Sequence, residues 1–135
     1  MNEILELLSH ARGFFAYFFA GLVFLGAYIM VYMATTKCDD LLLIRHGNTA
    51  AAASLVGSAV GFSLPLATAI LHTSSAPAFI FWAFVAMLTQ IATYFFLKLV
   101  LKDVDAQIEA NNPAYGILAG GISIVVGIIN AACVA

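Results

Sequence analysis

"NTAAAASLVGSAVG", residues 48–61, is a run of small side chains within a chain that is otherwise rich in leucine, isoleucine, valine and phenylalanine. Of the 135 residues, 64% are hydrophobic and only 9% are charged. This composition provides too little polar surface to cover a water-soluble globule. In a lipid bilayer, small residues let helix backbones approach closely, and this close packing drives helix association. The run therefore predicts a helix–helix contact inside a membrane.

Four stretches of the chain are long and apolar enough to span a bilayer, which takes about 20 residues per helix. They are Phe14–Thr35, Asn48–Leu71, Phe79–Leu101 and Ala114–Val134. The connections between them are too short to hold a soluble domain. We therefore predict an all-α integral membrane protein of four helices, with the lipid bilayer as its surroundings.

The basic residues predict the orientation of these helices. Lys37 and Arg45 flank the first connection, and Lys98 and Lys102 flank the third, whereas "HTSSAP" in the second connection contains neither Lys nor Arg. Because basic connections stay in the cytoplasm, we expect both chain termini outside. Arg12 is the one basic residue that opposes this orientation.

The amino-terminal segment "MNEILELLSHARGFF" lacks the basic region of a secretory signal, so we expect it to be retained. Ile4, Leu7, Leu8 and Ala11 recur with helical spacing, which favours a short helix lying in the membrane interface. The alternative is a frayed terminus.

The two halves of the chain align at an offset of about 64 positions. Asp39 then matches Asp103, and Asn48 matches Asn112. Each half contains two spans, so both copies run in the same direction across the membrane. We predict two parallel two-span repeats, residues 1–71 and 72–135, within one membrane domain.

Several motifs resemble a known family. "GNTAAAASLVGSAVGFSLPLATAI", "QIATYFF" in the third span and "GIINAA" near the end are similar to the DUF350 family, also called UPF0719. The resemblance covers nearly the whole chain. It implies a small multi-pass protein of the bacterial inner membrane with no established activity, and it points to a membrane-stress protein as a possible partner.

Small residues recur every four positions in the second and fourth spans, which predicts tight packing between helices. A proline within the second span is expected to kink it and to free the backbone carbonyl near residue 61 from its helical hydrogen bond. The candidate packing residues are Gly57, Gly61, Pro65, Gly116, Gly120 and Gly127.

Polar side chains within the spans form a candidate intramembrane site with two interpretations. They either make hydrogen bonds between helices, including one from Gln90 to a serine or to the freed carbonyl, or they line a narrow polar path. The candidate residues are Gln90, Ser58, Ser123, Thr89, Thr93 and Asn130.

Asn48 and Asn112 each begin a span just after an acidic turn and are expected to cap its first amide groups. The alternative is a vestibule at the cytoplasmic face, formed by these two caps together with Asp39 and Asp103.

The remaining features exclude several classes of function. A net charge of −2 without a basic tract disfavours nucleic-acid binding. Cys38 and Cys133 have no metal-ligand spacing and are not expected to form a disulfide. No ionisable residue lies deep in a span and no catalytic motif is present, so we expect neither an enzyme nor a cofactor.

Two hypotheses for the function remain. The first is a homo-oligomeric organiser or accessory subunit linked to membrane-stress maintenance. The second is a passive channel or carrier for a cation or a small neutral solute.

Overall fold

The computed structural model describes residues 1–36 and 39–134, and every regular element in these residues is a helix. In chain order the helices are α1 (Asn2–Thr35), α2 (Asp40–Arg45), α3 (Thr49–His72), α4 (Ala76–Val100), α5 (Val104–Glu109) and α6 (Pro113–Val134). The four long helices, α1, α3, α4 and α6, are each long and apolar enough to cross a membrane. This confirms the predicted all-α, four-span architecture.

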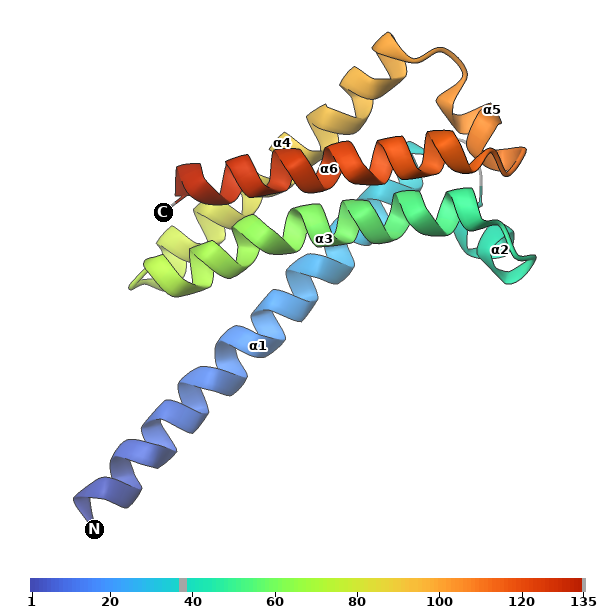
Figure 1. Cartoon of the computed structure of the whole chain (residues 1–135). Helices are drawn as coiled ribbons and strands as arrows, with labels where there is room; N and C mark the ends of the chain where they lie inside the picture. The colour runs from blue at the N-terminus through green and yellow to red at the C-terminus, as the bar shows by residue number, and fades with distance from the viewer. Residues whose placement is uncertain (37–38, 135) are drawn as a thin grey trace.

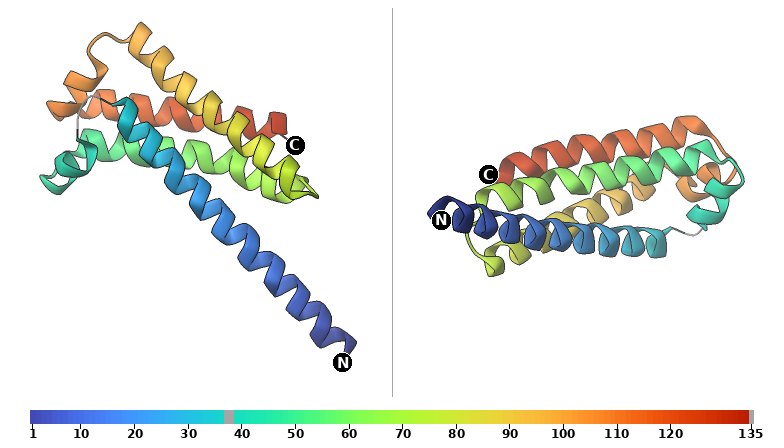
Figure 2. Two further views of the ribbon diagram at one scale, coloured as in Figure 1. Left: turned by 180° about the vertical axis from the view of Figure 1, so that it is seen from behind. Right: turned by 90° about the horizontal axis from the view of Figure 1, so that it is seen from below.

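The long helices form two layers. α3 and α6 lie side by side and run in the same direction, while α1 and α4 cross behind them (Figures 1 and 2). Both termini and the α3–α4 connection, residues 73–75, lie at one end of the molecule, which we call the turn end. α2 and α5 lie at the opposite end, the short-helix end.

Side-chain caps explain where several helices begin. Asn48 accepts from the Ala51 amide at the start of α3, and Ser75 accepts from the Ala78 amide at the start of α4. Asp39 caps α2 by accepting from the Leu42 amide. The predicted spans two to four agree with α3, α4 and α6 to within three residues at each end. The six-residue helices α2 and α5 were not predicted.

α1 differs from its prediction at the amino terminus. It is a single helix of 34 residues that starts at Asn2, so the prediction of a separate short segment is wrong, and so is that of a frayed end. Gly13 is the residue that separates the two predicted parts, and a glycine inside a helix costs only about 1 kcal/mol. The apolar residues of the predicted interfacial face continue the long helix and are exposed.

The order of a long, a short and a long helix occurs twice, in α1–α2–α3 and in α4–α5–α6. The common direction of α3 and α6 is the one that parallel repeats require. The two units pack differently, because α4 buries seven residues along its length whereas α1 buries three in its second half. The internal repeat stays a prediction.

Candidate functional site

The site is built around the contact between α3 and α6, where glycines bring the two backbones together. A Cβ atom added to Gly57 would lie 2.2 Å from the Gly120 Cα, and one added to Gly127 would lie 2.1 Å from the Gly61 carbonyl oxygen. A Cβ atom on Gly116 would lie 2.3 Å from the Ala50 carbonyl oxygen. Any larger residue at these three positions would push the helices apart.

Polar side chains are buried within and beside this contact. Ser58 and Ser123 face each other across it with their hydroxyl oxygens 3.5 Å apart, and Ser123 also donates to the Ala119 carbonyl at 2.9 Å. Gln90 enters from α4 and is 1% exposed. Its Nε2 donates to the Gly61 carbonyl oxygen at 3.3 Å.

Pro65 explains why the Gly61 carbonyl accepts this bond. Proline has no backbone N–H, so the carbonyl four residues earlier lacks its normal helical donor. Gln90 supplies the missing donor from another helix. The structure therefore contains a hydrogen bond from Gln90 to the freed carbonyl, which is the first of the two interpretations of Gln90. α3 continues through Pro65 as one helix to His72.

We predict that Gln90 and Pro65 are energetically coupled. Gln90→Leu should lower the free energy of unfolding by about 1 kcal/mol, because it leaves the Gly61 carbonyl without a donor. In the Pro65→Ala background, residue 65 regains its amide, and the effect of Gln90→Leu should fall to near zero. Unfolding of all four variants in mixed micelles measures this cycle.

Thr89→Val is the matched control for this cycle. The Thr89 hydroxyl donates only to the Val85 carbonyl of its own helix, at 2.8 Å, so its loss should change stability little. Equal effects of Gln90→Leu in both backgrounds would contradict the role assigned to Pro65.

The structure does not bring Thr89 and Thr93 together with Gln90. Both threonine hydroxyls donate to carbonyls of their own helix. They face a groove of about 560 Å³ between α4 and α6 that is otherwise apolar. Its lining residues are Thr89, Ala92, Thr93, Phe96, Ile122 and Val126. The two threonines therefore do not extend the polar contacts of Gln90 into a path.

Asn130 lies on the buried face of α6 and is 8% exposed. Its Nδ2 has no hydrogen-bond partner among the described residues. The Oε1 of Gln90 is likewise buried and unpartnered within this part of the chain.

Two tyrosines of this region, Tyr28 and Tyr32, and their partners on α3 were missed in the sequence. The Tyr32 hydroxyl lies 2.5 Å from the Ser54 hydroxyl, and the Tyr28 ring stacks on Phe62 at 4.6 Å between ring centroids. Both tyrosines are almost fully buried and hold the second half of α1 against α3. Their spacing of four residues could have indicated this contact, because it places two phenol groups on one face of the helix. Phenol groups need hydrogen-bond partners in an apolar environment.

At the short-helix end, two asparagines connect the halves of the chain. The Asn48 Oδ1 accepts from the Ala51 amide at 2.9 Å, while its Nδ2 donates to the Ile108 carbonyl at 2.8 Å. Asn111, which was not predicted, accepts from the Ala50 amide at 3.1 Å. The first turn of α3 is thus capped by both halves of the chain.

Asn112 makes weaker contacts than Asn48 at the matching position. Its Oδ1 accepts from the Ala114 amide at 3.3 Å on the exposed start of α6, and its Nδ2 donates to the Gln107 Oε1 at 3.1 Å. Asn48 borders a hollow of about 220 Å³ beside Glu109. Neither Asn112 nor Asp39 lines that hollow.

The acidic residues that contact other helices are neighbours of the predicted ones. Asp103 is exposed, adopts a left-handed backbone with φ 61° and makes no side-chain cap, whereas Asp105 forms an ion pair with Lys98 at 3.0 Å. The Tyr94 hydroxyl donates to the same carboxylate. Lys98 also donates to the Thr35 carbonyl at 2.7 Å and so joins the end of α1 to α4 and α5.

This second cluster has its own hollow. The hollow has a volume of about 210 Å³ and is lined by Lys98, Asp103, Val104, Asp105 and Ala106. The four residues of the predicted vestibule therefore do not line one hollow. Asn48 lines the first hollow and Asp103 lines the second, whereas Asn112 and Asp39 line neither. Similarly, Asp40 is 3% exposed and accepts from the Thr36 hydroxyl at 2.8 Å, whereas its neighbour Asp39 is exposed.

In residues 1–36 and 39–134, no three side chains of His, Cys, Asp or Glu are grouped closely enough to hold a metal ion. Cys133 is free and exposed. Cys38 lies outside the described residues.

Comparison with known proteins identifies the family. A family model described as Domain of Unknown Function (DUF350) matches residues 4–134. This chain belongs to the DUF350 family. The match runs from residue 4, near the start of α1, to the end of α6, so it covers all six helices of this DUF350 protein.

Two curated relatives share the length of this DUF350 chain. Each is named UPF0719 inner membrane protein YjfL, one from Escherichia coli strain K12 and one from Escherichia coli O157:H7. Each is 29% identical over 129 residues, which is 96% of this chain and 98% of the relative. No solved structure matches this chain. The family resemblance in the sequence is thereby confirmed.

Proposed function

We propose that this DUF350 protein is a homo-oligomeric structural subunit of a bacterial inner membrane, an organiser or accessory subunit rather than an enzyme. The names of its two relatives support the location. The observation that supports the assembly is the first part of α1, residues 2–16, which we call the α1 arm. A membrane-stress protein, to which the family resemblance points, would bind to this assembly.

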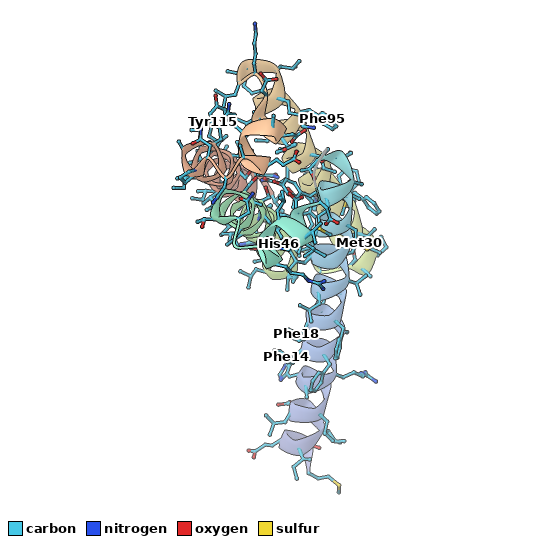
Figure 3. The ribbon with its side chains drawn as sticks, turned by 90° about the vertical axis from the view of Figure 1, so that its right-hand side faces the viewer. Phe14, Phe18, Met30, His46, Phe95 and Tyr115 are labelled. Carbon is cyan, nitrogen blue, oxygen red and sulfur yellow. The ribbon has the colours of Figure 1, made fainter. Side chains whose placement is uncertain are left out.

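The α1 arm extends away from the other helices of the protomer (Figures 1 and 3). Figure 3 shows Phe14 on this projecting part, with Phe18 next to it on the side nearer the bundle. The two rings stack at 5.6 Å between centroids, and Phe14 and Phe15 are 61% and 55% exposed. The first residue of α1 that is buried within the protomer is Gly21.

The other end of α1 is firmly held. Tyr28, Tyr32 and the bond from Lys98 to the Thr35 carbonyl fix it to α3 and α4. At about 1.5 Å per residue, the 34 residues of α1 are about 51 Å long, so the helix extends well beyond its packed half. A helix that is fixed to its bundle at one end and separated from it at the other leaves the apolar α1 arm without a partner in its own protomer. We propose that a second copy packs against this arm.

Cross-linking in vesicles tests this assembly. Phe15→Cys, in a chain with Cys38→Ser and Cys133→Ser, should form disulfide-linked dimers at low protein-to-lipid ratio. Ile129→Cys, at a position on α6 that is 60% exposed, is the matched control and should cross-link much less. The oligomer would be refuted if both variants cross-linked only in trace amounts and to the same extent, and if the protein had a monomeric mass in lipid nanodiscs.

A passive channel or carrier is the second candidate, and the buried Ser58, Ser123 and Gln90 favour it. The backbone contact between α3 and α6 opposes it, because the glycine pairs leave no room between these helices for a solute. Flux through proteoliposomes distinguishes the candidates. A channel should carry a cation or a small neutral solute and lose that flux in Gln90→Leu, because leucine makes an apolar constriction. An organiser should carry none in either form.

The orientation in the membrane is a further prediction. Arg45, Lys98 and Lys102 all lie toward the short-helix end, so this end should face the cytoplasm. In whole cells that carry the chain with Cys38→Ser and Cys133→Ser, a membrane-impermeant thiol reagent should label Ser74→Cys at the turn end and should leave Arg45→Cys unlabelled until the cells are opened. The opposite labelling pattern would reverse the predicted topology.

A further inference from the structure

Two buried amide groups have an atom that bonds to nothing in the described part of the chain. One is an acceptor, the Gln90 Oε1, and the other is a donor, the Asn130 Nδ2. The two side chains are only 1% and 8% exposed. A buried polar atom without a partner is unfavourable, and such atoms in native proteins are normally satisfied by protein or by an internal water.

The Gln90 amide contacts the Gly61 carbonyl, and the Asn130 amide lies three residues from Gly127, which packs against the same carbonyl. The Gln90 Nε2 donates to this oxygen at 3.3 Å, and its Oε1 would lie 3.1 Å from a Cβ atom added to Gly61. On the other side, a Cβ atom on Gly127 would lie 2.1 Å from the same carbonyl oxygen. Asn130 follows Gly127 by three residues on the buried face of α6.

The directions of the helices bring the two amides closer together. Side chains lean toward the amino terminus of their own helix. α4 begins at the turn end whereas α6 ends there, so Gln90 leans toward the turn end and Asn130 leans away from it. Asn130 thereby leans back toward the level of Gly127 and the Gly61 carbonyl.

We propose that the Gly61 carbonyl, Gln90 and Asn130 form a binding site for one internal water molecule between α3, α4 and α6. The water donates one proton to the Gln90 Oε1 and the other to the second lone pair of the Gly61 carbonyl. It accepts the proton of the Asn130 Nδ2. These three hydrogen bonds match the number that a buried water typically makes.

The site suits a neutral ligand. Its three groups are amides with partial charges, so they provide no net charge to balance an ion in the bilayer interior. Pro65 is essential to the site because it keeps the Gly61 carbonyl free of its helical hydrogen bond. The site is independent of whether the protein forms oligomers.

Solid-state NMR of the protein in vesicles with deuterated acyl chains tests this site. Magnetisation transferred from water protons should reach the Asn130 side-chain amide, which Asn130→Leu identifies by the loss of its signal. In Gln90→Leu, or in Gln90→Met if that variant does not fold, the transfer to Asn130 should fall at least fivefold. The Asn112 side-chain amide, near the short-helix end, is the internal control and should receive the same transfer in every variant.

Two results would overturn the inference. If the Asn112 amide receives transfer and the wild-type Asn130 amide receives none, the two unpartnered atoms are not joined by water. If transfer to Asn130 is unchanged in Gln90→Leu, the water that reaches it comes from the membrane surface and Gln90 is not part of its site.

Discussion

Replacing Gly127 with alanine should destabilise the protein by about 3 kcal/mol, near the upper end of the usual cost of inserting a methyl group into a packed interior. The added Cβ atom would lie 2.1 Å from the Gly61 carbonyl oxygen and 2.7 Å from the Gly61 Cα. These are backbone atoms of α3, so no side chain can rotate to make room. The helices must separate, which also breaks the neighbouring Gly57–Gly120 contact. Equilibrium unfolding in mixed micelles measures the loss.

Gly121→Ala is the matched control on the same helix. A Cβ atom added at Gly121 meets nothing within 4 Å. Alanine is the better helix former, so this variant should be unchanged or more stable by up to about 1 kcal/mol. A stability of Gly127→Ala equal to that of Gly121→Ala would show that α3 and α6 are not in backbone contact.

Asn48→Ala should lower stability by about 2 kcal/mol, because one side chain makes two different contacts. Its Oδ1 caps α3 through the Ala51 amide, and loss of a cap costs about 1 kcal/mol. Its Nδ2 donates to the Ile108 carbonyl in the other half of the chain, which also accepts from the Asn111 amide, and loss of this buried hydrogen bond costs about 1 kcal/mol more. Unfolding of the purified variant measures the sum.

Asn112→Ala is the control for this prediction, since Asn112 matches Asn48 in the proposed repeat. Asn112 makes a longer cap bond of 3.3 Å on an exposed helix start, so its loss should cost less than about 1 kcal/mol. Equal losses in the two variants would mean that the bond from Asn48 to Ile108 adds no stability, and that the two sites are equivalent.

The predicted and observed sites differ most where two acidic residues lie next to each other, or nearly so, in the sequence. The sequence "CDD" offers Asp39 and Asp40, and "DVD" offers Asp103 and Asp105. Asp40 is buried and Asp105 pairs with Lys98, whereas the two residues chosen from the alignment are exposed. The role of each carboxylate depends on where it lies on or beside its short helix. The six residues of α2 or of α5 are too few to show a hydrophobic period in the sequence, so this placement could not be predicted.

Thr89 and Gln90 illustrate the same limit inside a span. They are adjacent in sequence and both are polar, yet Gln90 contacts α3 while Thr89 faces the groove toward α6. Adjacent residues of a helix point about 100° apart, so composition alone does not tell which of them is buried.

The sequence by itself determined that this is an all-helical membrane protein with four spans, because the length of each apolar stretch and the scarcity of charge leave no other fold. It also determined that glycine-rich helices would be in close contact and that Pro65 would free a carbonyl, since both follow from local covalent structure. Only the tertiary structure decided which atoms meet: that Gln90 reaches the Gly61 carbonyl, that Asn48 joins Ile108, and that the α1 arm leaves its own bundle. These features depend on the rotation and crossing of whole helices, which are set by the summed packing of residues far apart in the chain.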